Sequence, residues 1–455
     1  MTTNEHIRKT LTLAGPVMLG QLGHVMVGVA DSIMVGQLGT IPLAAASLAN
    51  GVFIIILTIG LGFSFALTPL AAAADGKKNV MRKAAILKNG LLLNGLAAIF
   101  LALLLGAGVL LLDNLRQPPL VVEACRPYLL LIGASILPLM VYQVYKQFVE
   151  GLSHTRQAMY ISISANLLNV VLNYLLIFGK LGFPPLGLVG AGVATVISRL
   201  LMGGGMAMYY YLSSRYRHIR SYNEVVRIKK AHLSAIWRQG WPTALQFLFE
   251  VGAFSMATIM MGWISAKAQA AHQIAISLAS ITYMAASGIS ASATIRVGNQ
   301  LGASDFSSLR KAGFIAILIG GLFMALFCTF FIVFNDFLPT LYIDEIGVIE
   351  IAASLLVVAG FFQISDGVQV VTLGALRGMG DVKVPTIITF VAYWLIALPV
   401  GYLMGFHTTL GSSGVWFGLL TGLSVAAVLL LLRFHLESRR QKRKIKAARQ
   451  PLLFD

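Results

Sequence analysis

Long apolar stretches recur along the whole 455-residue chain, and short polar segments separate them. A helix needs about 20 apolar residues to cross a bilayer, and stretches such as 91–112 and 415–432 are long enough. They lack the strict apolar–polar alternation of barrel strands, so we predict helices. The pattern predicts twelve spans, at roughly 8–34, 44–74, 86–112, 122–148, 157–179, 187–213, 235–262, 269–300, 308–334, 347–375, 384–404 and 413–436.

The two halves of the chain match each other at a nearly constant offset. An offset of 226 superposes Pro16 on Pro242 and Gly62 on Gly288, and at 227 Gly151 falls on Gly378. Each half holds six spans, so both enter the membrane in the same orientation, as the parallel repeats of transporters do. We therefore predict an all-α polytopic membrane protein with twelve transmembrane helices in two pseudo-symmetric six-helix bundles.

The predicted domains follow from this duplication. An N-terminal six-helix lobe covers 1–213, a polar cytoplasmic linker covers 214–234, a C-terminal six-helix lobe covers 235–437, and a basic cytoplasmic tail covers 438–455. Prolines such as Pro16 remove a backbone donor, so a kink in the first span could reshape a pocket around Asp31, although many prolines in membrane helices make static kinks.

Composition and charge support a membrane protein over a nucleic-acid-binding one. The chain is 57% hydrophobic and 11% charged, with a mean hydropathy of +0.82. The net charge of +17 comes from Lys and Arg in alternate connections and in the tail, while the other connections hold only Arg116, Arg126, Lys180 and Lys267. This is the positive-inside pattern, which predicts that both termini are cytoplasmic. The tail contacts anionic lipid headgroups or is simply solvated.

Three carboxylates lie inside membrane-length apolar stretches: Asp31, Glu250 and Asp366. A charged side chain near the bilayer centre costs at least ~2.5–3.5 kcal/mol, so it usually faces a protein interior and has a function there. A bound proton or cation would neutralise it, which suggests an ion-coupled transporter. Glu250 and Asp366 could converge on one Na⁺, a hard cation that prefers oxygen ligands. Tyr283 could add a cation–π contact, or be an ordinary packing aromatic.

Polar side chains near Asp31 form a second candidate site. Asn169 and Asn173 are spaced i, i+4 on one helical face, although asparagines also serve as plain hydrogen-bonding groups between membrane helices. Arg199 lies within the sixth span and needs a partner that the sequence does not name.

A drug-binding cavity should be apolar and aromatic with few fixed charges, which suits an amphiphilic cation. The candidates for its lining are Asn50, Gln273, Phe361 and Trp394. The alternative for each aromatic residue is packing against lipid.

Three segments carry a resemblance to a known family. They are Asp31-Ser-Ile-Met-Val-Gly-Gln-Leu-Gly39, Gly374-Ala-Leu-Arg-Gly-Met-Gly-Asp381 and Gly179-Lys-Leu-Gly-Phe-Pro-Pro-Leu-Gly-Leu-Val-Gly-Ala-Gly192. With the doubled six-span layout, the chain from about 8 to 436 resembles the multidrug and toxic compound extrusion (MATE) family, closest to its NorM-like bacterial branch.

The resemblance implies a secondary active efflux antiporter of the bacterial inner membrane. It would export cationic amphiphilic drugs in exchange for Na⁺ or H⁺ by alternating access, as a monomer with no cofactor besides the coupling ion. It also implies that Glu250, Tyr283 and Asp366 form a sodium site and that Asp31 belongs to a first-half site for protons or sodium. Asn173 stands where a related branch has a second aspartate, which leaves the cation of that site open.

Two other classes are disfavoured. A lipid-linked saccharide flippase of the same superfamily would show several basic residues in its central cavity, and only Arg199 is well placed for that. An intramembrane enzyme would need a catalytic motif, but no His-Glu-x-x-His, Gly-x-Ser-x-Gly or phosphate-binding loop occurs, and the eight histidines are scattered.

Overall fold

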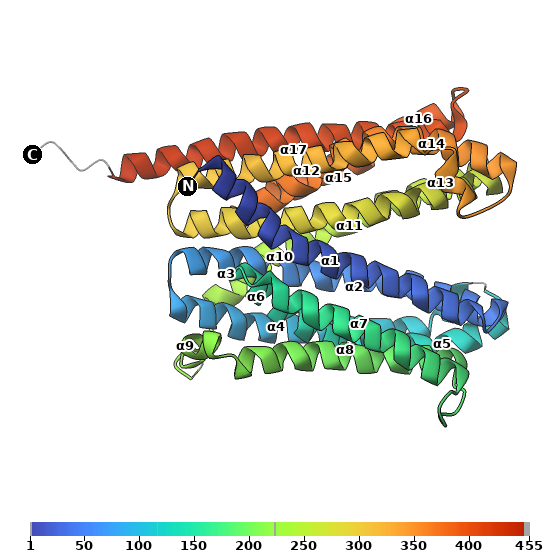
Figure 1. The fold of residues 1–455 in the computed structure, drawn as a ribbon, viewed down its shortest axis with the longest axis horizontal. Helices are drawn as coiled ribbons and strands as arrows, with labels where there is room; N and C mark the ends of the chain where they lie inside the picture. The colour runs from blue at the N-terminus through green and yellow to red at the C-terminus, as the bar shows by residue number, and fades with distance from the viewer. Residues whose placement is uncertain (1, 116, 223, 450–455) are drawn as a thin grey trace, which may run out of the picture. The chain divides into compact units, whose positions relative to one another are not determined.

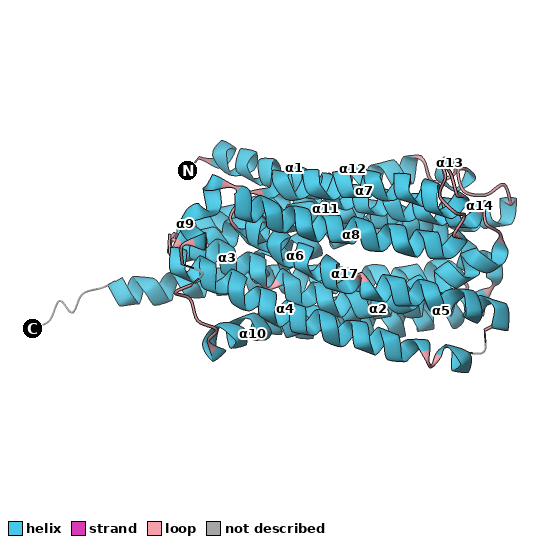
Figure 2. Cartoon of the chain, turned by 90° about the horizontal axis from the view of Figure 1, so that it is seen from below, coloured by secondary structure: helices cyan, strands magenta, loops and turns pink. Residues whose placement is uncertain are grey.

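The structure, a computed structural model, describes residues 2–115, 117–222 and 224–449, which form helices and no strand. Twelve spans among them are long and apolar enough to cross a membrane, so the predicted architecture is confirmed (Figures 1 and 2). Single helices form nine spans: α1 (Thr3–Gly36), α4 (Val80–Val109), α7 (Thr155–Phe178), α8 (Gly187–Leu212), α10 (Lys230–Ile264), α11 (Ala266–Gly302), α12 (Phe306–Val333), α14 (Ile346–Gly378) and α17 (Gly411–Arg449).

Three spans are interrupted helices. They consist of α2 (Thr40–Phe65) with α3 (Leu67–Gly76), of α5 (Pro119–Ala134) with α6 (Ile136–Gly151), and of α15 (Lys383–Phe390) with the π-helical segment η3 (Val391–Ala397) and α16 (Leu398–Phe406). Short helices in the connections are η1 (Leu112–Leu115), η2 (Ser214–Tyr216), α9 (Arg217–Arg220) and α13 (Phe337–Thr340).

Prolines explain the interruptions. Pro69 and Pro138 lack the N–H that would bond the carbonyl four residues earlier, and the helix breaks three residues before each of them, at Ala66 and Ser135. Pro399 likewise cannot bond the carbonyl four residues before it, and the π-helical segment η3 ends two residues before it, at Ala397.

The chain forms two compact units. The N-unit is Leu19–Ala244, and the C-unit combines Met1–Met18 with Leu245–Asp455. The chain thus passes from one unit to the other inside α1 and inside α10, whereas the predicted lobes 1–213 and 235–437 divide it at the polar connection. Pro16 and Pro242 each lie two residues before a division, and both helices continue across their proline.

Glycines allow close packing against the segments of α1 and α10 that cross into the other unit. In the C-unit, a side chain at Gly288 of α11 would place its Cβ 2.8 Å from the backbone nitrogen of Met18 of α1. In the N-unit, a Cβ at Gly62 of α2 would lie 2.2 Å from the Cα of Ala244 of α10. These contacts correspond at the 226-residue offset, so the duplication extends to the exchanged segments.

The hydrophobic cores lie within the units. One cluster fills the N-unit, while the C-unit has two, one around Trp416 and one around Phe434. At Gly374 a Cβ would lie 2.3 Å from the carbonyl oxygen of Ser290, so this glycine lets α14 approach α11 closely. This close approach gives the glycine that opens the 374–381 motif a packing role.

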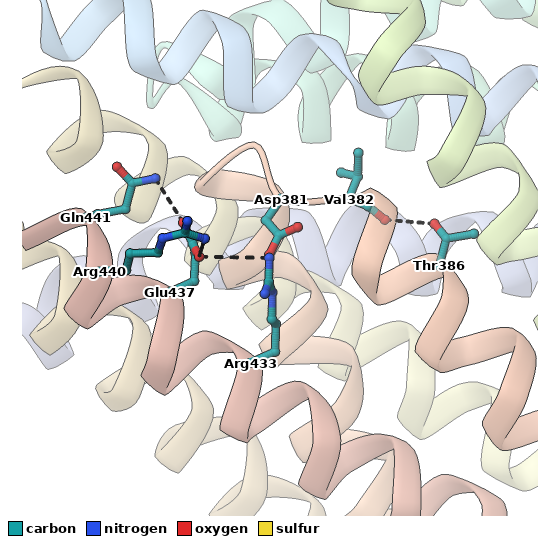
Figure 3. Close-up of polar contacts among 7 residues, drawn as sticks. All are labelled: Asp381, Val382, Thr386, Arg433, Glu437, Arg440 and Gln441. Carbon is teal, nitrogen blue, oxygen red and sulfur yellow. Dashed lines mark hydrogen bonds and ion pairs between the residues drawn. The ribbon is translucent and has the colours of Figure 1, made fainter. Parts of the chain in front are cut away.

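The end of that motif ties the α14–α15 turn to α17. Arg433 Nε of α17 donates to Asp381 Oδ2 at 2.7 Å, and its guanidinium lies 3.8 Å from Glu437 (Figure 3). Arg440 pairs with the same glutamate at 3.9 Å, and Thr386 bonds back to the carbonyl of Val382 (Figure 3). α17 continues through Arg449, and the rest of the predicted tail lies outside the described residues.

Candidate functional site

Two buried carboxylates form the centre of the candidate site in the C-unit. Glu250 of α10 is 7% exposed and Asp366 of α14 is 3% exposed, and the two lie within electrostatic range of each other. Neither carboxylate makes a hydrogen bond or an ion pair with any described residue. Two unpaired anionic groups at this depth are unfavourable together, so the arrangement fits a proton or a cation between them.

Tyrosines surround the two carboxylates. Tyr283 of α11, partly buried, and Tyr393 of η3, fully buried, both lie within electrostatic range of Glu250 and Asp366. The Tyr393 hydroxyl is 3.0 Å from Nε2 and 3.1 Å from Oε1 of Gln369, which holds the phenol in place. No cluster of three or more His, Cys, Asp or Glu occurs in the described residues, so oxygen ligands beyond the two carboxylates would have to be neutral.

Sequence reasoning missed Tyr393 and Gln369, although a signal exists. Gln363, Asp366 and Gln369 are spaced three residues apart on α14 and are all buried, at 0%, 3% and 0% exposure. Three buried polar side chains on one face of an apolar helix mark a polar interior surface. The Thr282 hydroxyl of α11 donates to Gln363 Oε1 at 2.8 Å, so this surface faces α11.

A partly buried arginine adjoins this site, and sequence reasoning missed it as well. Arg377, in the last turn of α14, donates to Gln246 Oε1 of α10 at 2.9 Å and lies 4.8 Å from the ring centroid of Phe247. Its Nε is buried without a partner in the described residues. Arg377 is within electrostatic range of Glu250 and Tyr283 but pairs with neither. The site therefore holds a fixed positive charge that is close to the carboxylates without neutralising them.

The N-unit holds a different polar site around Asp31 of α1. Asn173 Nδ2 of α7 donates to Asp31 Oδ1 and, at 3.2 Å, to Asn169 Oδ1. Asn169 and Asn173 are buried, whereas Asp31 is partly exposed. Both amide protons of Asn173 are used, and its Oδ1 is buried without a partner in the described residues. The structure thus brings all three predicted residues of this site together.

The structure also supplies the partners of Arg199 in α8. Its guanidinium donates to Ser135 Oγ at 2.5 Å, at the break between α5 and α6, and lies 4.8 Å from the ring centroid of Phe53. Asp31 and Tyr128 are within electrostatic range. The break that Pro138 imposes therefore places a hydroxyl where the partly buried arginine needs an acceptor.

The four predicted cavity residues are all exposed, but they belong to different units. Asn50 lies in the N-unit, and Gln273, Phe361 and Trp394 lie in the C-unit. Trp394 of η3 is 37% exposed, and its indole N–H donates to the carbonyl of Phe249 at 3.0 Å. A Cβ at Gly252 would lie 3.0 Å from the same indole ring. Trp394 is thus packed on α10 beside Glu250, which links a predicted cavity residue to the carboxylate site.

Comparisons with known proteins identify the family of the chain. The family model MatE matches residues 16–175 and 242–403, two segments that begin at the prolines superposed by the predicted repeat. The chain belongs to the MatE family. It is 36% identical over 437 residues to the "Probable multidrug resistance protein NorM" of Mesorhizobium japonicum, covering 94% of each chain. It is 31% identical to the "Multidrug resistance protein NorM" of Photobacterium profundum, again covering 94% of each.

Solved structures of MATE transporters share the fold. A MATE "in the straight conformation" matches with a TM-score of 0.88 at 22% identity, covering 96% of this chain and 97% of that one. The eukaryotic MATE transporter AtDTX14 matches with a TM-score of 0.86, also at 22% identity, covering 97% of this chain and 99% of that one. The predicted resemblance to NorM-like MATE proteins is therefore confirmed, and the chain is a multi-pass membrane transporter and not an enzyme. The roles assigned to individual residues stay predictions.

Proposed function

We propose that this MatE protein is a multidrug efflux antiporter that exports cationic amphiphilic compounds in exchange for Na⁺ or H⁺. The observation that carries the proposal is the pair of buried carboxylates, Glu250 and Asp366, that have no hydrogen bond or ion pair among the described residues. The names of the NorM relatives, which are multidrug resistance proteins, support the efflux part.

The coupling cation would bind between Glu250 and Asp366. Hydroxyl and ring groups of Tyr283 and Tyr393 would complete its surroundings, since Na⁺ prefers oxygen ligands and tolerates an aromatic face. A proton would serve the same purpose by neutralising one carboxylate. Na⁺ or a proton would reduce the repulsion between the two carboxylates. Binding of either cation is therefore favourable when the carboxylates are close together.

Arg377 would limit how tightly the cation is held. A fixed positive charge near the carboxylates repels the coupling cation bound between them. This repulsion raises the free energy of the bound cation and so speeds its release. Its hydrogen bond to Gln246 and its stacking on Phe247 keep the guanidinium short of an ion pair with Glu250. The site would thus be loaded and emptied repeatedly.

Drug binding would be coupled to the cation through α10 and η3. Trp394 is hydrogen-bonded to Phe249, next to Glu250, so a drug that moves this indole would also move the backbone that carries the carboxylate. Coupling requires that each ligand binds one conformation better than the other. Bending at Pro16 and Pro242, where α1 and α10 pass between the units, could provide the second conformation. Asp31 with Asn173 would form an additional proton or cation site.

We further propose that the protein acts as a monomer in the bacterial inner membrane, with both termini cytoplasmic. The basic connections at 77–88, 215–230 and 310–311 would then face the cytoplasm.

Ethidium transport in sealed vesicles tests the proposal. An imposed Na⁺ gradient alone, or a pH gradient alone, should drive ethidium movement by the purified protein. The Glu250→Gln/Asp366→Asn double variant should insert normally and lose this movement. Glu350→Gln is the matched control, because Glu350 is an exposed carboxylate on the same helix as Asp366. Full gradient-driven efflux by the double variant would refute the site.

The same assay separates antiport from the saccharide flippase. Movement of a lipid-linked saccharide with no response of ethidium to either gradient would favour the flippase and overturn the antiporter.

A further inference from the structure

Parts of the polar connection between α8 and α10 are hydrogen-bonded to helices of the N-unit. Arg220 of α9 donates to the carbonyls of Tyr210 and Ser213 at 2.6 and 2.8 Å. Lys88 of α4 donates to the carbonyl of Val226 at 2.8 Å, and the backbone N–H of Lys229 donates to Asn89 Oδ1 at 3.4 Å. Residues 226–229 therefore lie along the first three turns of α4.

A pocket of about 300 Å³ opens between this connection and the start of α4. Four of its lining side chains are basic or can become so: Arg82, Arg227, Lys229 and His232. The remaining lining residues are Asn79, Met81, Ala85, Val225 and Val226, so no carboxylate lines the pocket.

The cations of this pocket are not neutralised by the protein. None of Arg82, Arg227 and Lys229 makes an ion pair with a described residue, and Arg82 and Lys229 lie within electrostatic range of His232. Like charges that converge without a counter-ion repel each other. A bound anion would relieve this repulsion, and the arginines offer planar N–H donors that match a phosphate.

The helix ends around the pocket add to the attraction for an anion. α4 begins at Val80, with Asn79 as its N-cap, and α10 begins at Lys230, so the positive ends of two long helix dipoles border the pocket.

We propose that this pocket binds a phosphate group, carried by an anionic membrane phospholipid. The argument for a lipid is the apolar rim: Met81, in the first turn of the span Val80–Val109, is 47% exposed, and Val225, in the connection before the span that begins at Lys230, is 63% exposed; both line the pocket. A soluble phosphate would gain nothing from these side chains, whereas the glycerol and acyl portions of a lipid would cover them. The bound lipid would join the 225–229 segment to α4.

Lipid retention by the purified full-length chain tests the proposal. Native mass spectrometry would count bound phosphatidylglycerol, with phosphatidylcholine and inorganic phosphate as separate arms. The Arg82→Gln/Arg227→Gln variant should bind phosphatidylglycerol about tenfold more weakly than the unmodified protein, because charge-assisted hydrogen bonds are lost. The Lys77→Gln/Arg217→Gln control removes two exposed cations that do not line the pocket and should leave the affinity unchanged.

The arms identify the source of the phosphate. If inorganic phosphate binds as tightly as phosphatidylglycerol, the phosphate site stands and the assignment to a lipid is overturned. Unchanged phosphatidylglycerol binding by a folded Arg82→Gln/Arg227→Gln variant would overturn the site itself. Trypsin cleavage of the unmodified protein after Arg227 and Lys229 gives a readout that needs no variant. Phosphatidylglycerol should slow this cleavage, and an equal rate with phosphatidylcholine would count against the proposal.

Discussion

The two units share a duplicated scaffold but differ in the chemistry of their polar sites. At the 226-residue offset, the position of Glu250 corresponds to His24, and that of Asp31 corresponds to Ala257. At 227, Asp366 corresponds to Leu139. The carboxylate site of the C-unit therefore has two buried acids without hydrogen-bond donors among the described residues, whereas the Asp31 site of the N-unit has one partly exposed acid that accepts a hydrogen bond from Asn173. Duplication preserved the close packing at Gly62 and Gly288 and the proline pair Pro16 and Pro242, while the buried polar residues diverged.

We expect this difference to separate the tasks of the two units. A carboxylate that already accepts an amide hydrogen bond depends less on a cation than one with no donor. We therefore expect the C-unit to provide most of the cation affinity and the N-unit to modulate it.

The largest effect should come from removing one carboxylate of the C-unit. Asp366→Asn should weaken Na⁺ binding by about a hundredfold or more, because breaking a buried charge interaction costs about 3–5 kcal/mol. Asp31→Asn should change it far less, since the amide of Asn173 already satisfies one oxygen of Asp31. Na⁺-dependent thermal stabilisation of the purified variants measures both. Equal losses in the two variants would mean that the units contribute alike.

A second acid in the N-unit should make it resemble the C-unit. Asn173→Asp replaces a donor by a like charge beside Asp31 and removes the bond to Asn169, which should cost about 2–3 kcal/mol at alkaline pH. Acidification or Na⁺ should restore part of this loss. Asn173→Ala is the control, because it removes the donor without adding charge and should show no Na⁺-dependent recovery. Melting curves with and without Na⁺ decide between these outcomes.

The fixed charge of the C-unit gives a smaller and opposite effect. Arg377→Gln removes the positive charge near Glu250, so Na⁺ affinity should rise about tenfold and turnover should fall because release slows. Arg377→Lys keeps the positive charge, so its Na⁺ affinity and turnover should stay close to those of the unmodified protein. Arg199→Gln is the matched control in the N-unit, where Na⁺ affinity at Glu250 and Asp366 should not change. Equilibrium Na⁺ titration with parallel efflux rates checks the prediction, and a lower affinity in Arg377→Gln contradicts it.

The sequence predicted the spans well and the site only in part, for a physical reason. Hydropathy and length locate a helix in a membrane, so the predicted span 384–404 became Lys383–Phe406. They do not fix how a helix that is apolar on nearly all sides is rotated about its own axis. This rotation decides which side chains of neighbouring helices are in contact. Carboxylates stand out because their burial is costly, which is why the sequence singles out Glu250 and Asp366 and does not single out the neutral Tyr393.

The charge of an arginine within the 374–381 motif was equally hard to interpret. Arg377 lies in a segment that the family resemblance singled out, yet its acceptor, Gln246, is 131 residues away on another helix. Only the structure shows that this arginine bonds to Gln246 of α10 and lies within electrostatic range of Glu250.

The smallest predicted effect concerns a matched pair of turns outside the spans. At the 227-residue offset His154 corresponds to Asp381. A ring nitrogen of His154 lies 3.0 Å from the Tyr216 hydroxyl, whereas Asp381 forms an ion pair with Arg433 at 2.7 Å. Burial, and then the charge of Arg215, lowers the pKa of His154 from 6.5 to about 4.

The folded protein therefore keeps His154 neutral while the unfolded chain binds a proton below pH 6.5. The stabilisation from the neutral ring is complete above pH 6.5 and is lost as the pH falls from 6.5 through 4. Solvent reaches part of the ring, so the loss should be about 1 kcal/mol. His154→Gln should melt at a temperature that changes less between pH 7.5 and pH 5 than that of the unmodified protein. Asp381→Asn should instead make stability less sensitive to salt, because it removes an ion pair. If His154→Gln shows the full pH dependence of the unmodified protein, the neutral turn of the N-unit is not the source of its acid sensitivity.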